Sequence, residues 1–147
     1  MTIINEMSLS FESRSSNEAF ARSAVAAFAA QLDPTIGELS DIRTAVSEAV
    51  TNCVVHAYKD TIGKISLNVK LTSDNSIIVR IHDSGCGIED VKQAMTPLYT
   101  TAPGDDRAGL GFAVMQSFTD KVSVRSKPGK GTTVTLKKAL SRRLSDA

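Results

Sequence analysis

Hydrophobic residues in this chain recur first with a helical period and later with a period of two, and that order limits the folds open to it. One short alternating segment precedes two helical stretches, and four alternating segments follow with two short helices among them. The predicted strands cover residues 7–11, 64–71, 76–83, 121–126 and 132–137. This grouping predicts an α+β sandwich in which a mixed, largely antiparallel sheet carries helices on one face.

Two long helices are expected in the first half of the chain. Ser15 followed by Glu18 has the pattern of a capping box and predicts a helix from there to about residue 31. That helix should stop before Pro34, because the residue preceding a proline disfavours the helical conformation. A second helix with a continuous apolar stripe is predicted over residues 37–58. The remaining predicted helices are short and cover residues 89–95 and 112–118.

Charge and cysteine usage indicate an ordinary cytoplasmic protein. The 17 Lys and Arg residues nearly balance the 16 Asp and Glu residues, so no nucleic-acid partner is expected. Lys137 and Lys138 belong to the only basic cluster, which is interpreted as a solvated end. Cys53 and Cys86 lie at no metal-ligand spacing.

The chain is expected to form a single domain over residues 1–140, followed by a short polar tail, residues 141–147. It begins without a recognisable secretory leader. No apolar stretch approaches the length of a membrane span, and no membrane partner is expected.

Polar groups of two predicted elements fall where a cleft could form. Glu48 and Asn52 are four residues apart on the second helix, so they project from one face, beside the apolar stripe. Asp83 ends the apolar face of its strand, and Gly85 and Gly87 complete the motif Asp-x-Gly-x-Gly. A carboxylate there could accept a hydrogen bond from an exocyclic amine, and the glycines would let a flat ligand approach. An exposed helix surface and a simple strand-ending turn remain the ordinary alternatives.

Two further glycine motifs are weaker signals. Residues 96–108 show no period and are predicted to form a long loop, which in a compact domain is usually functional or disordered. The loop leads to Gly109-Leu110-Gly111 at a helix start, where free N–H groups and the helix dipole favour phosphate. Gly131-Thr132 opens the last strand after a turn. Each motif taken alone is common.

The joint order of these motifs is more specific. Glu-x-x-x-Asn on a helix, Asp-x-Gly-x-Gly after a strand, Gly-x-Gly after a long loop and a late Gly-Thr resemble the signature of the GHKL ATPases and kinases, which share the Bergerat fold. Within that superfamily the chain is most similar to the anti-sigma F factors, the serine-protein kinases of endospore formation. The stretches that carry this similarity are residues 5–7, 17–22, 31–35, 46–52, 97–101 and 109–112.

The resemblance implies roles for the motif residues. Glu48 would be the catalytic base, and Asn52 would hold the Mg²⁺ that bridges the phosphates of ATP or ADP. Asp83 would read the adenine, with Thr132 near the base. Arg107 would lie near the terminal phosphate or the protein substrate. The other nucleotide-binding residues would be Gly85, Gly87, Thr100, Thr101, Gly109, Leu110 and Gly111.

The resemblance also implies protein partners. The substrate would be a serine of a small anti-anti-sigma factor. A homodimer of the chain would bind a sporulation sigma factor of the sigma F type. Arg22, a lone charge among Phe20, Ala21 and Ala24, is a candidate contact, although an ordinary surface arginine would explain it nearly as well.

Several alternatives would use the same fold. An ATP-hydrolysing machine of the gyrase or MutL type needs a further domain that supplies a lysine. A histidine kinase needs a helical dimerisation segment with a phospho-accepting His, and nothing in the chain resembles either part. A stress-response anti-sigma B kinase would share the mechanism. A non-catalytic module would use ATP only to set its affinity for a sigma factor.

Overall fold

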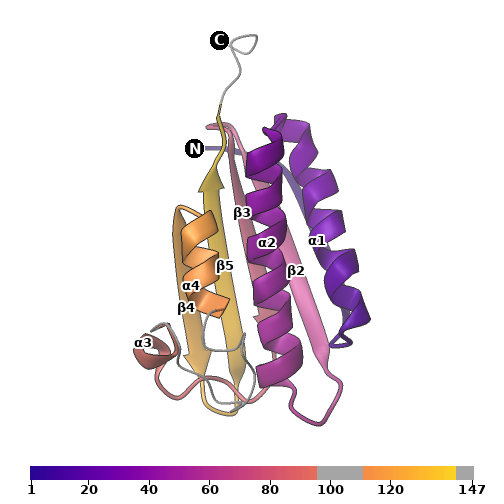
Figure 1. Ribbon diagram of the computed structural model, residues 1–147, viewed down its shortest axis with the longest axis vertical. Helices are drawn as coiled ribbons and strands as arrows, with labels where there is room; N and C mark the ends of the chain where they lie inside the picture. Colours follow the sequence, from indigo (N-terminus) through magenta and orange to yellow (C-terminus); the bar gives the residue numbers. More distant parts are fainter. Residues whose placement is uncertain (96–110, 142–147) are drawn as a thin grey trace.

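The sheet contains five strands and is antiparallel at every junction in the residues that the structure describes. The structure, a computed structural model, describes residues 1–95 and 111–141. The strand order is β1-β2-β3-β5-β4 (Figure 1). The strands are β1 (Ile3–Glu12), β2 (Lys64–Thr72), β3 (Ser76–Asp83), β4 (Lys121–Lys127) and β5 (Gly131–Ala139). The predicted α+β class is confirmed.

The helices pack on one face of this sheet. Figure 1 shows α1, α2 and α4 side by side across it, with α3 near its lower end. Their bounds are α1 (Ser16–Ala29), α2 (Ile36–Asn52), α3 (Val91–Ala94) and α4 (Gly111–Phe118). None of the helices within residues 1–95 and 111–141 combines the length and apolar character needed to cross a membrane.

The alternation of the strands explains why one face is covered. In β3 the apolar residues Ile77, Val79 and Ile81 are buried beneath the helices, whereas Arg80 and His82 are exposed on the other face. The period of two therefore sends one apolar row into the core, as the sequence predicts. Asp83 ends that row and is itself buried.

The predicted capping box at Ser15 is wrong. Ser15 adopts a helical conformation (φ −58°, ψ −31°) and its side chain makes no capping hydrogen bond. Glu18 instead accepts hydrogen bonds from Arg22 and from Ser47 of α2, so tertiary packing has taken the carboxylate that the cap would need. The capping box of the structure is at the start of α2, between Thr35 and Glu38.

Glu38 also joins α2 to the end of β5. Its carboxylate accepts hydrogen bonds from the backbone N–H of Thr35 at 2.8 Å and of Ser141 at 2.7 Å. Desolvation by burial raises the pKa of Glu38, but these hydrogen bonds outweigh it, so the pKa lies below its usual value of 4.5. The ionised carboxylate therefore favours the folded state above that pH, and the contribution is lost as the pH falls through the lowered pKa.

We expect Glu38→Gln to reduce the loss of thermal stability that accompanies a fall in pH. Wild-type protein should lose thermal stability between pH 6 and pH 3, and the variant should lose less, because it has no carboxylate to protonate at this junction. Melting temperatures followed by circular dichroism across that range provide the measurement. Glu12→Gln, at an exposed position, is the control and should keep the wild-type slope. Equal slopes for Glu38→Gln and the wild type would contradict the assignment.

Candidate functional site

A cavity of about 340 Å³ lies where the end of α2, the end of β3 and the start of β5 meet. Asn52 is the last residue of α2 and Asp83 is the last residue of β3. Asp83 pairs directly with Thr132 across the β3–β5 ladder. All three line the cavity, so the structure brings together residues that lie up to 80 positions apart (Asn52 to Thr132). The sequence predicts this convergence only through the resemblance.

The Asp83 carboxylate is held in a fixed orientation. The residue is only 3% exposed. One oxygen, Oδ1, accepts the backbone N–H of Gly85 at 2.9 Å, and Oδ2 lies 3.5 Å from Cys53 Sγ, which can donate its hydrogen. A carboxylate oriented in this way on a cavity wall suits a ligand that carries an N–H donor.

The end of α2 changes its helical type beside the cavity. The predicted helix to residue 58 is present, but Cys53–Ala57 forms a π-helical turn. Such turns occur frequently at functional sites. The carbonyl of Ala57 accepts the N–H of Cys86 at 3.0 Å, and the carbonyl of His56 lies 3.2 Å from Cys86 Sγ. The π-helical turn thereby anchors the glycine loop that follows Asp83.

Tyr58 fastens the same loop from the other side. Its hydroxyl accepts the N–H of Ser84 at 2.7 Å and donates to the carbonyl of Lys64, also at 2.7 Å. Burial raises the pKa of Tyr58, and the charge of Asp83 adds to this rise. The neutral hydroxyl can therefore both donate and accept at this junction.

The two glycines of the motif serve the packing of the loop. A Cβ on Gly85 would lie 2.3 Å from the carbonyl oxygen of Ala57. Gly87 has a φ of +75°, and a Cβ there would lie 2.1 Å from the carbonyl oxygen of Lys127. Side chains are therefore excluded at both positions by neighbouring backbone. Gly87 lines the cavity, and its predicted contact with a nucleotide stays a prediction.

Glu48 lies one turn before Asn52 on α2 and is half-buried. Among the described residues it is not part of the cavity wall, which begins at Ala49. Gly111 begins α4. The predicted site residues Thr100, Thr101, Arg107, Gly109 and Leu110 lie outside the described residues.

Arg22 is separate from this cavity. It lies on α1, and its Nη1 is 3.3 Å from Glu18 Oε1 on the preceding turn. The Arg22 side chain is 40% exposed, yet its Nε is buried and has no hydrogen-bond partner in the part of the chain that the structure describes. The predicted contact with a protein partner stays a prediction.

Sequence reasoning missed most of the apolar wall. Phe112, at the start of α4, and Val134, on β5, line the cavity together with Ile88 and Ala94. Phe112 directly follows Gly111 of the Gly-x-Gly motif. That position beside a predicted phosphate-binding motif is the sequence signal that could have identified it. The remaining lining residues are Ala49, Cys53, His56, Ala57, Lys59, Cys86, Glu89, Asp90 and Pro128.

We expect the two cavity cysteines to differ sharply in reactivity. Cys53 is buried, and burial, followed by the charge of Asp83, raises the pKa of its thiol well above the usual value. Cys86 is exposed. The thiolate is the reactive form of cysteine. At pH 8, one thiol of the native protein should therefore react rapidly with Ellman's reagent, and both thiols should react after denaturation. Cys86→Ser should abolish the fast phase and Cys53→Ser should leave it; the reverse result would contradict this assignment.

A family model describes the same stretch of chain. The histidine kinase-like ATPase domain matches residues 11–138, which include β2, β3, β4, nearly all of β5, the helices and the cavity but only the end of β1. An anti-sigma F factor of Caldanaerobacter subterraneus subsp. tengcongensis is 56% identical over 138 residues, covering 94% of this chain and 96% of the relative. An anti-sigma F factor of Geobacillus stearothermophilus is 52% identical over 136 residues, covering 92% of each.

Solved structures agree on the fold. The RsbU and RsbW domains of Rv1364c from Mycobacterium tuberculosis superpose with a TM-score of 0.69 at 21% identity, over 94% of this chain and 32% of that one. The histidine kinase domain from Erythrobacter litoralis EL346 superposes with a TM-score of 0.56 at 20% identity, over 84% of this chain and 60% of that one. The fold is that of the GHKL kinase and ATPase domains. The chain belongs to the histidine kinase-like ATPase family, and within it to the anti-sigma F factors. Membership of an ATPase family implies that it binds a nucleotide.

Proposed function

We propose that this protein is an anti-sigma factor that binds a sigma factor of the sigma F type and uses Mg-ATP to phosphorylate a serine of an anti-anti-sigma factor. The observation that carries the proposal is the convergence of Asn52, Asp83 and Thr132 on one cavity. It occurs in a chain that is 56% identical, over nearly its whole length, to an anti-sigma F factor. That relative's name supports the sigma-factor partner.

Asp83 would select adenine. Its buried carboxylate can accept a hydrogen bond from the exocyclic amine of the base, while the Gly85 N–H and the Cys53 thiol hold the carboxylate in place. Thr132 is buried on the neighbouring strand, and its hydroxyl lies 2.7 Å from that of Ser126. A guanine presents a carbonyl oxygen at the position of the adenine amine, so it would leave the carboxylate without a donor. This arrangement supports ATP or ADP as the ligand.

Asn52 would supply the protein ligand for Mg²⁺. Its carboxamide oxygen is a hard oxygen donor, and Asn52 lines the same cavity as Glu89 and Asp90. Mg²⁺ commonly takes only one or two protein ligands and completes its shell with phosphate oxygens and waters, so this donor set fits the ion. When bound, the ion would neutralise charge that develops on the transferring phosphoryl group.

Glu48 would act as the general base. It would accept the proton of the serine hydroxyl as the serine oxygen bonds to the γ-phosphorus and the bond to the bridging oxygen of ADP breaks. Arg107 would stabilise the terminal phosphate or contact the protein substrate. By resemblance, the phosphates and the adjoining nucleotide would also contact Gly85, Gly87, Thr100, Thr101, Gly109, Leu110 and Gly111.

The sigma factor would bind away from the cavity, whereas the serine of the anti-anti-sigma factor would have to reach the terminal phosphate within it. Arg22 is half-exposed on α1 and oriented by Glu18, so it could contact the sigma factor without large reorganisation. We also propose a homodimer in the cytoplasm as the form that binds the sigma factor. These assignments rest on the resemblance to the anti-sigma F factors.

One observation favours a second candidate, a non-catalytic nucleotide-gated sigma-binding module. The described wall of the cavity begins at Ala49 and does not include Glu48. A base that stays out of reach of the phosphates would leave nucleotide binding intact without transfer. The two functions therefore differ in one observable, which is the covalent transfer of phosphate.

Incubation with γ-labelled ATP, Mg²⁺ and the anti-anti-sigma factor tests the proposal. Label should appear on a partner serine and be absent without Mg²⁺, and sigma binding should be measured in parallel by pull-down. Nucleotide-dependent sigma binding without any labelled serine would establish the module instead. Phosphate release that exceeds partner labelling would point to a hydrolase.

A further inference from the structure

The short helix α4 carries a wall of the cavity but is too short to be stable alone. It has eight residues, from Gly111 to Phe118, and so spans only about 12 Å. Isolated helices of this length are marginal in water, so α4 depends on tertiary anchors. Met115 is one of them and is completely buried. At the other end, Phe112 lines the cavity.

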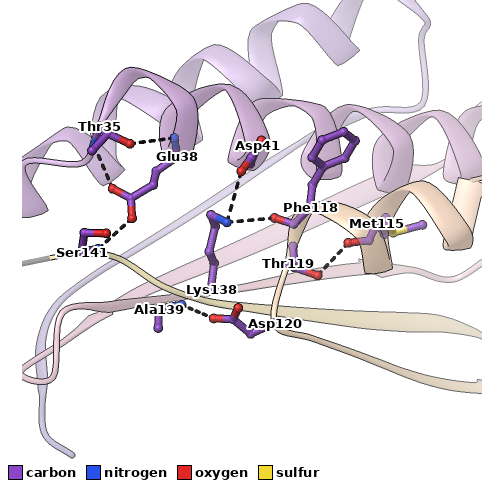
Figure 2. Close-up of polar contacts among 10 residues, drawn as sticks. All are labelled: Thr35, Glu38, Asp41, Met115, Phe118, Thr119, Asp120, Lys138, Ala139 and Ser141. Carbon is purple, nitrogen blue, oxygen red and sulfur yellow. Dashed lines mark hydrogen bonds and ion pairs between the residues drawn. The ribbon is translucent and has the colours of Figure 1, made fainter.

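The C-terminal end of α4 is held by two side chains (Figure 2). Lys138 Nζ donates to the carbonyl of Phe118 at 3.2 Å, and Thr119 Oγ1 donates to the carbonyl of Met115 at 2.7 Å. A helix leaves its last carbonyls without backbone partners, and a cation there also favours the helix dipole. Lys138 therefore satisfies both needs from the neighbouring strand β5.

The same ammonium group contacts α2. Lys138 Nζ lies 3.4 Å from Asp41 Oδ2, and Figure 2 shows the lysine reaching between the two helices. The side chain of Lys138 is 14% exposed and that of Asp41 is 34% exposed. This pair corrects the sequence interpretation of Lys138 as part of a solvated end. One partly buried lysine links α2, α4 and β5, and we call Lys138, Asp41 and the Phe118 carbonyl the helix clamp.

The remaining contacts of Figure 2 make the strand side of the helix clamp rigid. Asp120, just after α4, accepts the backbone N–H of Ala139 at 2.6 Å, and Glu38 of α2 accepts that of Ser141 at 2.7 Å. Two residues that follow Lys138 are thus tied to α2 and to the segment just after α4. The helix clamp has little freedom to slide along the sheet.

The two helices that meet at the helix clamp both reach the cavity. α2 continues from Asp41 to Asn52, and α4 runs back from Phe118 to Phe112. A shift of α4 along α2 would therefore displace Phe112 relative to Asn52. We propose that Lys138 and Asp41 are positioning residues that set the nucleotide affinity of the cavity by fixing the register of α4 against α2. The proposal rests on the proposed nucleotide site.

The experiment measures the dissociation constant for a fluorescent ATP analogue with Mg²⁺ at 20 °C. Lys138→Met keeps an unbranched apolar stem of similar packing but removes the ammonium group, and Asp41→Asn removes the partner charge. Each should weaken binding about fivefold, and the double variant should be no weaker than the worse single variant, because the two residues act as one unit. Lys138→Arg should restore near-wild-type affinity.

Two comparisons separate positioning from a general loss of stability. Lys121→Met removes an exposed lysine of the adjacent strand β4 and should leave affinity unchanged. In a Phe112→Ala background, Lys138→Met should cause no further loss, because the helix clamp acts through Phe112. Melting temperatures are recorded for every variant at the same pH.

The outcomes are distinct. Folded Lys138→Met and Asp41→Asn proteins with lower melting temperatures but wild-type affinity would overturn the proposal and leave a purely structural clamp. An undiminished loss in the Phe112→Ala background would also overturn it. If Lys138→Met does not fold, the more exposed Asp41→Asn decides the question alone. Wild-type protein that binds no nucleotide would instead refute the proposed function.

Discussion

Asp83→Asn is expected to weaken ATP binding about 100-fold. The substitution keeps the size of the side chain and an oxygen that can accept the Gly85 N–H, but it removes the charge that would meet the adenine amine. A hydrogen bond to a charged group contributes up to about 3 kcal/mol, which corresponds to the stated factor. Calorimetric titration with ATP and Mg²⁺ gives the dissociation constant.

The base of the nucleotide offers a second way to remove the same hydrogen bond. Inosine triphosphate lacks the exocyclic amine, so wild-type protein should bind it far more weakly than ATP. Asp83→Asn should bind both nucleotides with similar affinity, because the contact is already lost. A variant that still prefers ATP by the wild-type factor would show that another group reads the base.

Asp60→Asn is the matched control for Asp83→Asn. Asp60→Asn makes the same chemical change in a turn. Residue 60 has a φ of +57°, a conformation that asparagine tolerates well. It is exposed and does not line the cavity. Both variants should remain folded, as judged by circular dichroism, so that a loss of affinity confined to Asp83→Asn reports on recognition.

Glu48→Gln is expected to lower phosphoryl transfer by a factor of about 10³ while nucleotide affinity stays near that of the wild type. The amide is similar in size to the carboxylate but accepts no proton at neutral pH, and general-base catalysis contributes a factor of this order. Single-turnover labelling of the anti-anti-sigma serine measures the rate, and fluorescent-nucleotide titration measures the affinity.

The control for Glu48→Gln lies outside both the cavity and the helix clamp. Glu12→Gln makes the identical change at an exposed position at the end of β1, which does not line the cavity, and should transfer phosphate at the wild-type rate at pH 7.5. Unimpaired transfer by Glu48→Gln would exclude this residue as the base. A parallel loss of nucleotide affinity would assign it to binding instead of proton transfer.

The hydrophobic periodicity of the sequence was sufficient to predict the fold class, because each helix and strand has a clear apolar side. The alternation in β3 predicted correctly that Asp83 would end the buried row. The local signal failed at Ser15, where Glu18 bonds Ser47 from another helix. It failed again at Lys138, which follows Lys137 in a basic cluster but whose partners are Asp41 and the end of α4. In both cases a contact distant in sequence replaced the local expectation.

The sequence by itself determined the class of fold, the succession of strands and helices along the chain, and the residue types available for a nucleotide site. These features depend on local periodicity and on the order of the motifs. Only the tertiary structure decided that Asp83 faces Thr132 across a ladder, that Cys53 touches Asp83 and that Phe112 closes the wall. The physical reason is that strand register and helix packing minimise the free energy of the whole chain, so they depend on contacts that no local window contains.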